Sequence, residues 1–262
     1  MRQFGRSISL TVGDRRWVYP DLHFDFRVDL DDDPEPNQGT VTAYNLSDDS
    51  INVIREGAPA VLAAGYGDDR GTVIAGHIDR AETRHEAPDR VTHLDITDAG
   101  GAWRQVRIDR SYRPGVRASQ VLRDIFATAG LEVGAMSLPR DPDYPRGLTV
   151  SEPLASIAKR TAADAGARLH IQHGTVYIRH GQEGSRTAFV LRHDTGLVDS
   201  PQRLEEEGAN TFNAWCLLNH RLKPDVIVRI ESRTANGLFR VRRAQFIASS
   251  EDFMNHLEVV AI

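Results

Sequence analysis

The chain has 262 residues, of which 40% are hydrophobic and 26% are charged, a composition typical of a folded protein with a sizeable core. Its formal net charge of −5 gives no general electrostatic affinity for nucleic acid, and no apolar run approaches the roughly 18 residues of a membrane-spanning helix. The N-terminus lacks the apolar core of a signal peptide, and the single cysteine, Cys216, lies in an apolar run. We therefore expect no Sec export, no membrane partner, no internal disulfide and a buried, inert thiol.

The first hundred residues or so alternate apolar and polar side chains with the period of a half-buried strand. In the clearest run, Phe24, Phe26 and Val28 share one face while Asp25 and Arg27 share the other. Strands are predicted at 7–12, 24–30, 40–46, 60–66, 72–85, 90–98 and 104–109. Several short strands at close spacing favour a closed or nearly closed barrel, because closure removes exposed edges.

Two connections interrupt these strands. Ser47 is placed to cap a short helix whose inner face carries Ile51 and Ile54 and which ends before Gly57. The acidic, proline-containing stretch 31–37 predicts a solvated loop, because its prolines cannot pair in a sheet interior. As a calcium site it lacks the regular oxygen spacing and the glycine of an EF-hand loop.

After Pro114 and Gly115 the periodicity becomes helical. A first helix is predicted around the apolar residues 121–129 with Gly130 as its C-terminal stop. Ser151 is placed to cap a second helix, with Pro153 in its first turn and Gly166 at its end. Strands at 168–172 and 175–179 then form a hairpin around His173 and Gly174, followed by a polar linker at 181–186. This organisation predicts a small α-β-α-β-β module.

The chain from residue 196 to its end again has strand character, with many β-branched residues and a hairpin turn predicted at Asn236 and Gly237. One pattern occurs twice. Arg80-Ala81 is followed thirteen residues later by His93-Leu94, and Arg243-Ala244 is followed thirteen residues later by His256-Leu257. Self-similarity at a fixed spacing indicates one supersecondary unit used twice. A coincidence between two arginine-rich hairpins is the alternative.

The expected fold class is therefore mainly β with an α+β insertion. Two similar antiparallel β-barrel domains, at 1–113 and 185–262, flank the small α-β-α-β-β module at 114–184. Strands from the first part are candidates to complete the second barrel.

No catalytic, cofactor-binding or metal-binding residue emerges from the sequence. The histidines form two groups, one on adjoining strands and one around a hairpin: His77, His85 and His93; His170, His173 and His180. Neither group has zinc-ligand spacing, and surface histidines are the expected reading, although His170 and His180 lie on paired strands and could approach one another. The run 205–207 of three glutamates predicts a solvated loop, and carboxylate pairs for glycoside hydrolysis stay open because the fold creates them.

Several motifs resemble those of tailed-phage baseplate hub proteins. In the C-terminal half they are Gly-Leu-Val-x-Ser-Pro at 196–201, Leu-Leu-Asn-x-x-Leu-x-Pro at 217–224, Val-x-Ile-Glu-Ser at 228–232 and Asn-Gly-x-Phe-Arg-Val at 236–241. In the first half they are Val-Thr-Ala-Tyr-Asn-Leu-Ser at 41–47, Ala-Ala-Gly-Tyr at 63–66 and Val-Ile-Ala-Gly-His-Ile at 73–78. The motifs keep their order over nearly the whole chain. One departure is the segment 246–252, which lacks the His-x-Gly-Asp of many relatives.

The resemblance implies a non-enzymatic virion protein of the tail baseplate, assembled in the host cytoplasm. A homotrimer would present six near-equivalent barrels and join the hexameric tail tube to the trimeric spike. The implied partners are the tube or distal tail protein, the spike and, through a middle module at 114–184 that projects outward, other baseplate proteins. DNA would only pass through the channel, which we expect to be neutral or acidic, with some acidic loops lining it. The terminal strand 257–262 is a candidate trimer edge.

Two functions from other classes remain as alternatives. A peptidoglycan hydrolase acting at the tail tip is one, although the β-domains and the small module account for the whole chain. The other is glycan or peptidoglycan binding by residues 117–180.

Overall fold

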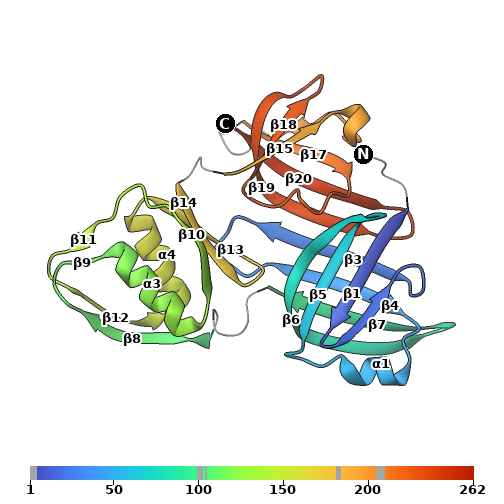
Figure 1. Cartoon of the computed structure of the whole chain (residues 1–262), viewed down its shortest axis with the longest axis horizontal. Helices are drawn as coiled ribbons and strands as arrows, with labels where there is room; N and C mark the ends of the chain where they lie inside the picture. The colour runs from blue at the N-terminus through green and yellow to red at the C-terminus, as the bar shows by residue number, and fades with distance from the viewer. Residues whose placement is uncertain (1–4, 99–102, 104, 181–183, 205–209) are drawn as a thin grey trace. The chain divides into compact units, whose positions relative to one another are not determined.

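The computed structural model describes residues 5–98, 103, 105–180, 184–204 and 210–262. The fold is mainly β, and the chain forms two compact units (Figure 1). Unit 1 comprises Met1–Asp31, Asn37–Thr97 and Gly184–Ile262, and unit 2 comprises Asp32–Pro36 and Asp98–Glu183. Both β-rich parts of the sequence therefore belong to the same compact unit.

One large sheet builds unit 1. Its strands are β1 (Arg6–Val12), β2 (Arg15–Val18), β3 (Phe24–Asp31), β4 (Gln38–Tyr44), β5 (Pro59–Tyr66), β6 (Asp69–Glu86), β7 (Asp89–Thr97), β15 (Ser185–Leu191), β16 (Gln202–Arg203), β17 (Thr211–Leu217), β18 (Val226–Glu231), β19 (Asn236–Ala248) and β20 (Phe253–Ala261). Within the described residues the strand order is β16-β17-β20-β19-β3-β4-β7-β6-β5-β1-β2, and β18 lies between β15 and β19 on a branch. The short helices α1 (Asp48–Val53) and η1 (His193–Thr195) connect strands.

The alternation of the sequence explains this sheet. Along β3 every second residue is apolar and buried, and the charged residues between them are partly or fully exposed, as predicted. The Ser47 hydroxyl accepts the backbone N–H of Ser50 at 3.3 Å, which confirms the predicted cap of α1. Ile54 is buried at the end of that helix, also as predicted.

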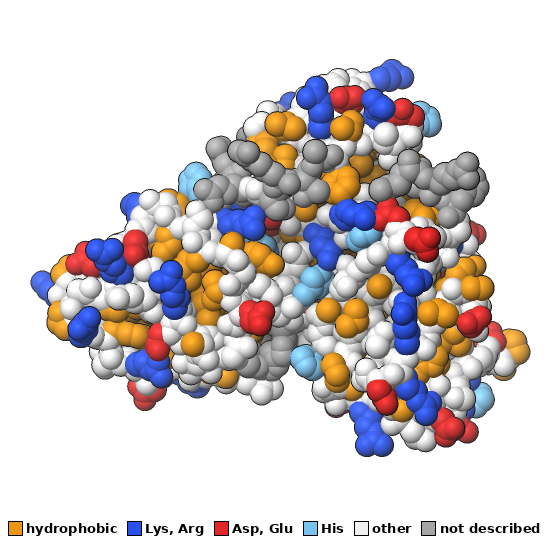
Figure 2. Space-filling model, in the orientation of Figure 1, with side chains coloured by type: hydrophobic (Ala, Val, Ile, Leu, Met, Phe, Trp, Pro, Cys, Tyr) orange, Lys and Arg blue, Asp and Glu red, His pale blue; other side chains and the backbone are white. Residues whose placement is uncertain are grey.

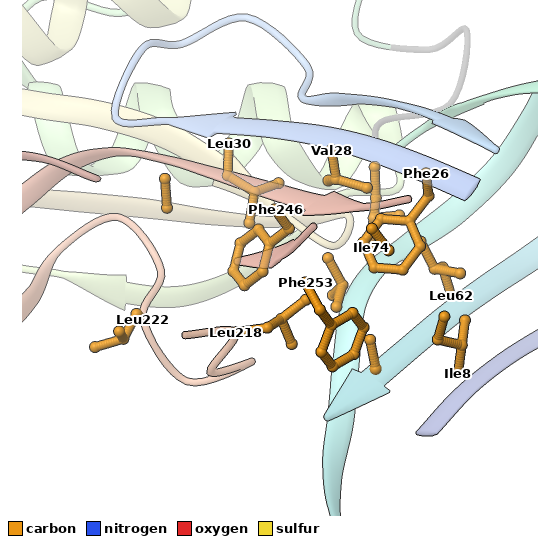
Figure 3. Packing of buried hydrophobic residues seen from close by; sticks show 14 of the residues in the cluster. Ile8, Phe26, Val28, Leu30, Leu62, Ile74, Leu218, Leu222, Phe246 and Phe253 are labelled. Atoms are coloured by element: carbon orange, nitrogen blue, oxygen red, sulfur yellow. The ribbon is translucent and has the colours of Figure 1, made fainter. Parts of the chain in front are cut away.

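A single apolar core lies on one face of the sheet and is shared by both β-rich parts of the sequence. Phe26 and Ile74 come from the first part, and Phe246 and Phe253 come from the second (Figure 3). All four side chains are at most 4% exposed. Cys216 also belongs to this core, which confirms the prediction of a buried thiol.

Unit 2 has its own core and is α+β. Its elements are β8 (Arg107–Tyr112), β9 (Val116–Arg117), α3 (Ala118–Ala129), β10 (Glu132–Met136), β11 (Asp143–Tyr144), β12 (Leu148–Pro153), α4 (Leu154–Asp164), β13 (Ala167–Gln172) and β14 (Thr175–His180). The apolar stripes of both helices are buried, including Leu122 and Ile157. Gly130 ends α3 with a φ of 66°, and His173 and Gly174 form the β13–β14 turn, both as predicted.

Two predictions about the start of this unit are wrong. The strand predicted at 104–109 as part of the first barrel is β8, which pairs with β12 inside unit 2. Ser151 lies within β12 and does not cap a helix, because pairing with β8 keeps the backbone extended as far as Pro153. The helix α4 starts only at Leu154, whose N–H donates to the Val106 carbonyl at 3.0 Å.

The acidic stretch 31–37 contains the predicted loop, but this loop is only partly solvated. Asp32 forms an ion pair with Arg168 at 2.7 Å, and its side chain is only 12% exposed. Glu35 forms an ion pair with Lys159. The residues Asp32–Pro36 therefore belong structurally to unit 2, since their carboxylates have basic partners there.

Two predictions about the last hairpin also need correction. The hairpin between β18 and β19 exists, but Asn236 pairs with Glu231, so the turn is formed by residues 232–235 rather than by Asn236 and Gly237. In this turn the Ser232 N–H donates to the Ala235 carbonyl at 3.1 Å. The terminal strand is not an edge, because β20 pairs with β17 on one side and β19 on the other.

The remaining sequence predictions concern linkers and membrane spans. The predicted linker 181–186 is partly outside the described residues, and β15 already begins at Ser185. The glutamate run 205–207 also lies outside them. Among the described helices, none combines the length and apolar character that crossing a membrane requires.

Candidate functional site

The two β-rich parts of unit 1 have the same strand order. The first repeat (24–97) has the order β3-β4-β7-β6-β5, and the second repeat (202–261) has the order β16-β17-β20-β19-β18. In each repeat the first and second strands along the chain are neighbours in the sheet, and the fifth strand along the chain pairs with the second. The flanking strands differ, because β1 is antiparallel to β5 whereas β15 is parallel to β18.

The residue register within the two repeats is also the same. Arg80, Ala81 and Glu82 pair with Asp95, Leu94 and His93 across β6 and β7. Arg243, Ala244 and Gln245 pair with Glu258, Leu257 and His256 across β19 and β20. A bulge shifts the register just before each arginine, between Ile78 and Arg80 and between Val241 and Arg243. The repetition seen in the sequence is therefore a structural repeat down to single residue pairs.

The two repeats join through β19 and β3. Before the bulge β19 pairs with β18, and after it residues 243–248 pair with β3 in the register Arg243–Asp31 to Ala248–Phe26. Figure 1 shows the red strand β19 next to the blue strand β3. Because β3 also pairs with β4, the sheet runs without interruption from the second repeat into the first.

The face of this sheet opposite the core is polar, and we call it the polar face. The register places two groups of side chains on this face. In the first repeat they are Asp25, Arg27, Asp29, Asp31, Thr40, Thr42, Arg80, Glu82, Arg84, His93 and Asp95. In the second repeat they are Asn213, Trp215, Arg243, Gln245, His256 and Glu258. Residues directly opposite on neighbouring strands lie close enough to interact. Polar side chains therefore face one another on this side of the sheet from β17 to β6, interrupted by the apolar pair Ile247 and Met254.

Hydrogen bonds and ion pairs hold these rows together. Thr40 donates to Asp95 at 3.2 Å, and Glu82 accepts from Arg84 at 2.7 Å and from Arg80 at 2.9 Å. At the junction, Gln245 of the second repeat donates to Asp29 of the first. Acidic side chains outnumber arginines on the polar face, so it is not a basic surface.

Two aromatic groups on this side have shifted pKa values. The Tyr44 hydroxyl donates to Asp25 at 2.8 Å, and this bond, with burial and the charge of Asp25, raises the pKa of Tyr44 to about 12. His256 stacks on Trp215 with ring centroids 4.3 Å apart, and burial lowers the pKa of His256. Both groups are therefore uncharged at neutral pH.

The polar face is hollowed where the repeats meet. A concavity of about 570 Å³ is lined by Arg27, Asp29, Asp31, Leu204, Asn213, Arg243, Gln245, His256 and Glu258. Arg27 lies 3.3 Å from Asp29, and Arg242 lies 3.4 Å from Glu258. A glycosidase needs two carboxylates, one of them held protonated, on either side of a sugar. Two of the three carboxylates in this concavity, Asp29 and Glu258, are instead paired with arginines.

The histidines do not converge. His93 contacts the Thr42 hydroxyl at 3.2 Å, while His77 and His85 are exposed on β6. The prediction of a surface position is wrong for His170, which is 2% exposed and stacks on Tyr177, and the register places His180 opposite Ala167 rather than opposite His170. No group of three metal-ligating side chains occurs among the described residues.

Unit 2 has a concavity of about 500 Å³ at the start of α3, lined by Arg117, Ser119, Gln120, Arg123, Met136, Leu138 and Asp141. Asp141 accepts the Ser119 N–H at 2.9 Å and its hydroxyl at 2.8 Å, so the helix terminus already has an anionic partner.

The role of β3 as the junction strand was not among the predictions from the sequence. A usable signal was present, because β3 alternates over eight residues without proline or bulge. Edge strands usually carry such interruptions, so this regularity indicates a strand paired on both sides.

No protein-family model matches the chain, and no curated protein sequence matches it either. Solved structures do match. The 43 kDa tail protein of prophage MuSo2 from Shewanella oneidensis is 11% identical, with a TM-score of 0.72 and 98% of each chain covered. A tail protein from Neisseria meningitidis MC58 is 12% identical, with a TM-score of 0.67 and coverage of 98% of this chain and 97% of the other.

A third structure extends the likeness to a secretion system. It is an Escherichia coli component of the type VI secretion system, described as structurally similar to the T4 bacteriophage tail proteins gp27 and gp5. It is 10% identical, with a TM-score of 0.69 and coverage of 97% of this chain and 76% of the other. The chain thus has the fold of these tail proteins over nearly its full length.

Proposed function

We propose that the chain is the structural hub of a tail-tip baseplate. Three copies form a ring of six near-equivalent β-repeats, which joins a hexameric tail tube to a trimeric spike and leaves a channel for DNA. The proposal combines the fold that the chain shares with phage tail proteins and the internal repeat of unit 1.

The observation that carries this proposal is the repeated register. Two repeats with the same strand order and the same bulge stand side by side in one sheet. A trimer therefore presents six similar units although it has only three chains. Such a ring can match sixfold symmetry on one side and threefold symmetry on the other, which is what an adaptor between a tube and a spike requires.

The polar face supports the assignment of a channel wall. Its opposite face is occupied by the apolar core, so only the polar face is free to line a lumen. The concavity at the junction of the repeats opens on this face. Figure 2 shows charges of both signs interspersed on the visible surface of the molecule. A wall of mixed charge with an excess of acids would let DNA pass without holding its phosphates.

Native mass spectrometry and electron microscopy of the purified full chain test this proposal. We expect a particle of three 29.1 kDa chains, with a ring of six similar densities around a central hole. A chain that stays monomeric at all concentrations, or that forms a twofold dimer, would contradict the hub. The concentration series should extend to high micromolar values, because ring closure depends on mass action.

The proposal includes its partners and location. The ring contacts the tube or a distal tail protein on one side and the spike on the other, and unit 2 contacts other baseplate proteins. The protein would then be found in assembled tails. Immunogold labelling of intact particles tests the location, and labelling along the tube rather than at its tip would contradict it.

An assay with purified peptidoglycan distinguishes the proposed structural role from that of a cell-wall hydrolase. We expect no release of soluble fragments when the full chain is incubated with purified peptidoglycan. Release of reducing sugars would contradict a purely structural role. Retention on the insoluble wall without release would instead favour glycan binding, which variants of Arg117 and Arg123 in the unit 2 concavity would then localise.

A further inference from the structure

The C-terminal half of β6 is paired on only one flank in the part of the chain that the structure describes. β7 pairs with β6 as far as Glu86, whereas β5 pairs with it only from Asp69 to His77. Residues 80–86 therefore present a row of backbone N–H and C=O groups on the other flank. Such an edge is a template for another strand.

The second repeat shows which strand fits this flank. Its equivalent of residues 80–85 is the segment 243–248 of β19, which follows the same bulge and pairs with β3. The equivalent of β3 in the second repeat is β16, because β3 pairs with the outer flank of β4 and β16 pairs with the outer flank of β17. β16 is itself the end strand of the sheet. Among its described residues, each molecule thus has two unpaired strand flanks, on residues 80–86 of β6 and on β16, that are equivalent to the two strands of the β19–β3 junction.

These two halves are not paired with each other within the chain that the structure describes. Along the sheet, β16 and β6 are separated by seven strand spacings of about 4.8 Å each. A second copy is the partner that supplies the missing half of the junction on each side.

We propose that residues 80–86 of β6 pair antiparallel with β16 of a second copy, in the register Glu82–Leu204, Thr83–Arg203 and Arg84–Gln202. This inference rests on the proposed hub and names its subunit interface. The junction between β19 and β3 within the chain is its template.

The register on the β6 side follows from the repeat. Arg80 is equivalent to Arg243, since both follow the bulge and face an acid on the next strand. Counting onward, Thr83 is equivalent to Phe246 and Arg84 to Ile247.

The register on the β16 side follows in the same way. Asn213 faces Glu258 as Thr40 faces Asp95, so Asn213 and Thr40 are equivalent. Gln202 faces Asn213 and Arg27 faces Thr40, which makes Gln202 equivalent to Arg27 and Arg203 equivalent to Val28. Within the chain, Arg27 pairs with Ile247 and Val28 with Phe246. Substituting the equivalents pairs Gln202 with Arg84 and Arg203 with Thr83.

The charges on β6 do not prevent this pairing. Arg80, Glu82 and Arg84 alternate along one face, where they form ion pairs with each other. β3 carries the same alternation of Asp25, Arg27 and Asp29 and is nevertheless paired on both flanks. The charged side chains point to the polar face, while the backbone groups that pair lie in the plane of the sheet.

The proposed interface is heterologous, because β6 of one copy meets β16 of the next. Heterologous contacts close into a ring when the rotation divides a full turn, and otherwise grow without limit. With the β19–β3 junction inside each chain and the β6–β16 junction between chains, three copies give six junctions of one kind and leave neither half of a junction unpaired.

Disulfide trapping tests the register. In a Cys216→Ala background, one chain carries Thr83→Cys and a co-expressed, differently tagged chain carries Arg203→Cys. Both positions are exposed, so the substitutions leave the fold intact. Paired residues in antiparallel strands have Cα atoms about 4.5–5.5 Å apart, within the range of a disulfide. We expect a covalent dimer containing both tags, and no covalent dimer when either variant is expressed alone.

The chain with both Thr83→Cys and Arg203→Cys should form covalent species of up to three subunits and no larger ones. A matched control replaces Thr83→Cys by Arg84→Cys, which shifts the pair by one residue and places the two thiols on opposite faces. Its cross-linking yield should be at least about tenfold lower.

The outcomes separate this interface from the hub itself. A native trimer in which the Thr83–Arg203 pair cross-links no better than the shifted pair overturns the proposed register and leaves the hub standing. A chain that is monomeric by native mass overturns both. A covalent ladder that extends beyond three subunits overturns the closed ring.

Discussion

Asp225 occupies in the second repeat the backbone position that Gly57 occupies in the first. Both residues have a positive φ, 71° for Asp225 and 81° for Gly57. The N–H of Asp225 donates to the Val241 carbonyl at 2.9 Å, and the N–H of Gly57 donates to the Ile78 carbonyl at 2.8 Å. Val241 and Ile78 are the residues just before the two bulges. The same combination of turn and bulge therefore occurs in both repeats.

The two repeats have different side chains at the positive-φ position of this turn. Glycine adopts a positive φ without strain, whereas an aspartate there costs about 1 kcal/mol. The Asp225 carboxylate lies 3.5 Å from the Arg240 guanidinium, and the side chains of Asp225 and Arg240 are 5% and 6% exposed. The second repeat thus places the side chain of the strained residue in a buried ion pair.

We expect Gly57→Ala to lower the free energy of unfolding by about 1–2 kcal/mol, measured by urea denaturation. The added Cβ meets no heavy atom within 4 Å, so backbone strain is the only cost. Gly57→Asn should cost less, because asparagine tolerates a positive φ better. Equal stabilities of the alanine variant and the natural chain would show that the turn is not strained.

Asp225→Ala should destabilise the chain by about 3–5 kcal/mol, although it shortens a side chain in a strained position. The reason is that Arg240 loses a carboxylate partner in a buried site. Asp225→Asn serves as the control, because it keeps the shape and removes only the charge. In a double-mutant cycle, Arg240→Met should recover part of the loss. Additive effects of the two substitutions would contradict the pairing.

The sequence showed the repeat wherever side chains serve the same purpose in both copies. Arg80-Ala81 and Arg243-Ala244 match because the bulge before them and the acids opposite them are the same. Gly57 and Asp225 do not match, because one backbone conformation is reached by two different residues. The preceding connections also differ, with a helix from Asp48 to Val53 in the first repeat and a short turn at 219–222 in the second.

Other features escaped because their partners are distant in the sequence. The loop at 31–37 has the composition of a solvated loop, yet Arg168, 136 residues away, pairs with Asp32. Ser151 has the local signature of a helix cap, yet β8 holds it in a strand. Local patterns predict the element types well here, whereas the unit to which an element belongs depends on pairings that no local pattern contains.

Phe246→Ala should destabilise both repeats together by about 3–5 kcal/mol, because the side chain is fully buried in the core that they share. In hydrogen exchange measured by mass spectrometry, peptides from β4 and from β20 should lose protection to the same extent. Peptides from β13 in unit 2 provide the internal control and should change little. Loss of protection confined to the second repeat would contradict a single cooperative core.

Cys216 should not react with thiol reagents in the native chain at pH 8, and should react at once in urea. Burial raises the pKa of the Cys216 thiol to about 12, so almost no thiolate is present. Because the folded pKa is raised, the thiol's contribution to stability is present below its unfolded pKa of about 8.5 and is lost as the pH rises toward 12.

Comparing the natural chain with Cys216→Ala isolates that contribution. The stability advantage of the natural chain should shrink as the pH rises from about 8.5, since the other titrating groups are common to both proteins. An advantage independent of pH, together with rapid labelling at pH 8, would contradict the buried position of the thiol.

The polar face predicts weak interaction with DNA. At about 150 mM salt, fluorescence anisotropy with a short duplex should show no binding at micromolar concentrations of the natural chain. Thr42→Arg combined with Gln245→Arg adds two cations to the polar face of each copy, and each new arginine faces an aspartate, so the sheet is not disturbed by like charges. This variant should gain binding that weakens steeply with salt.

The control variant combines Asp14→Arg with Asp68→Arg, at exposed positions off the polar face. It changes the net charge even more, but it should gain less affinity for the duplex. If the natural chain bound the duplex as tightly as the arginine variant does, a channel wall on the polar face would retain DNA, and the proposed passage of DNA through the ring would have to be abandoned.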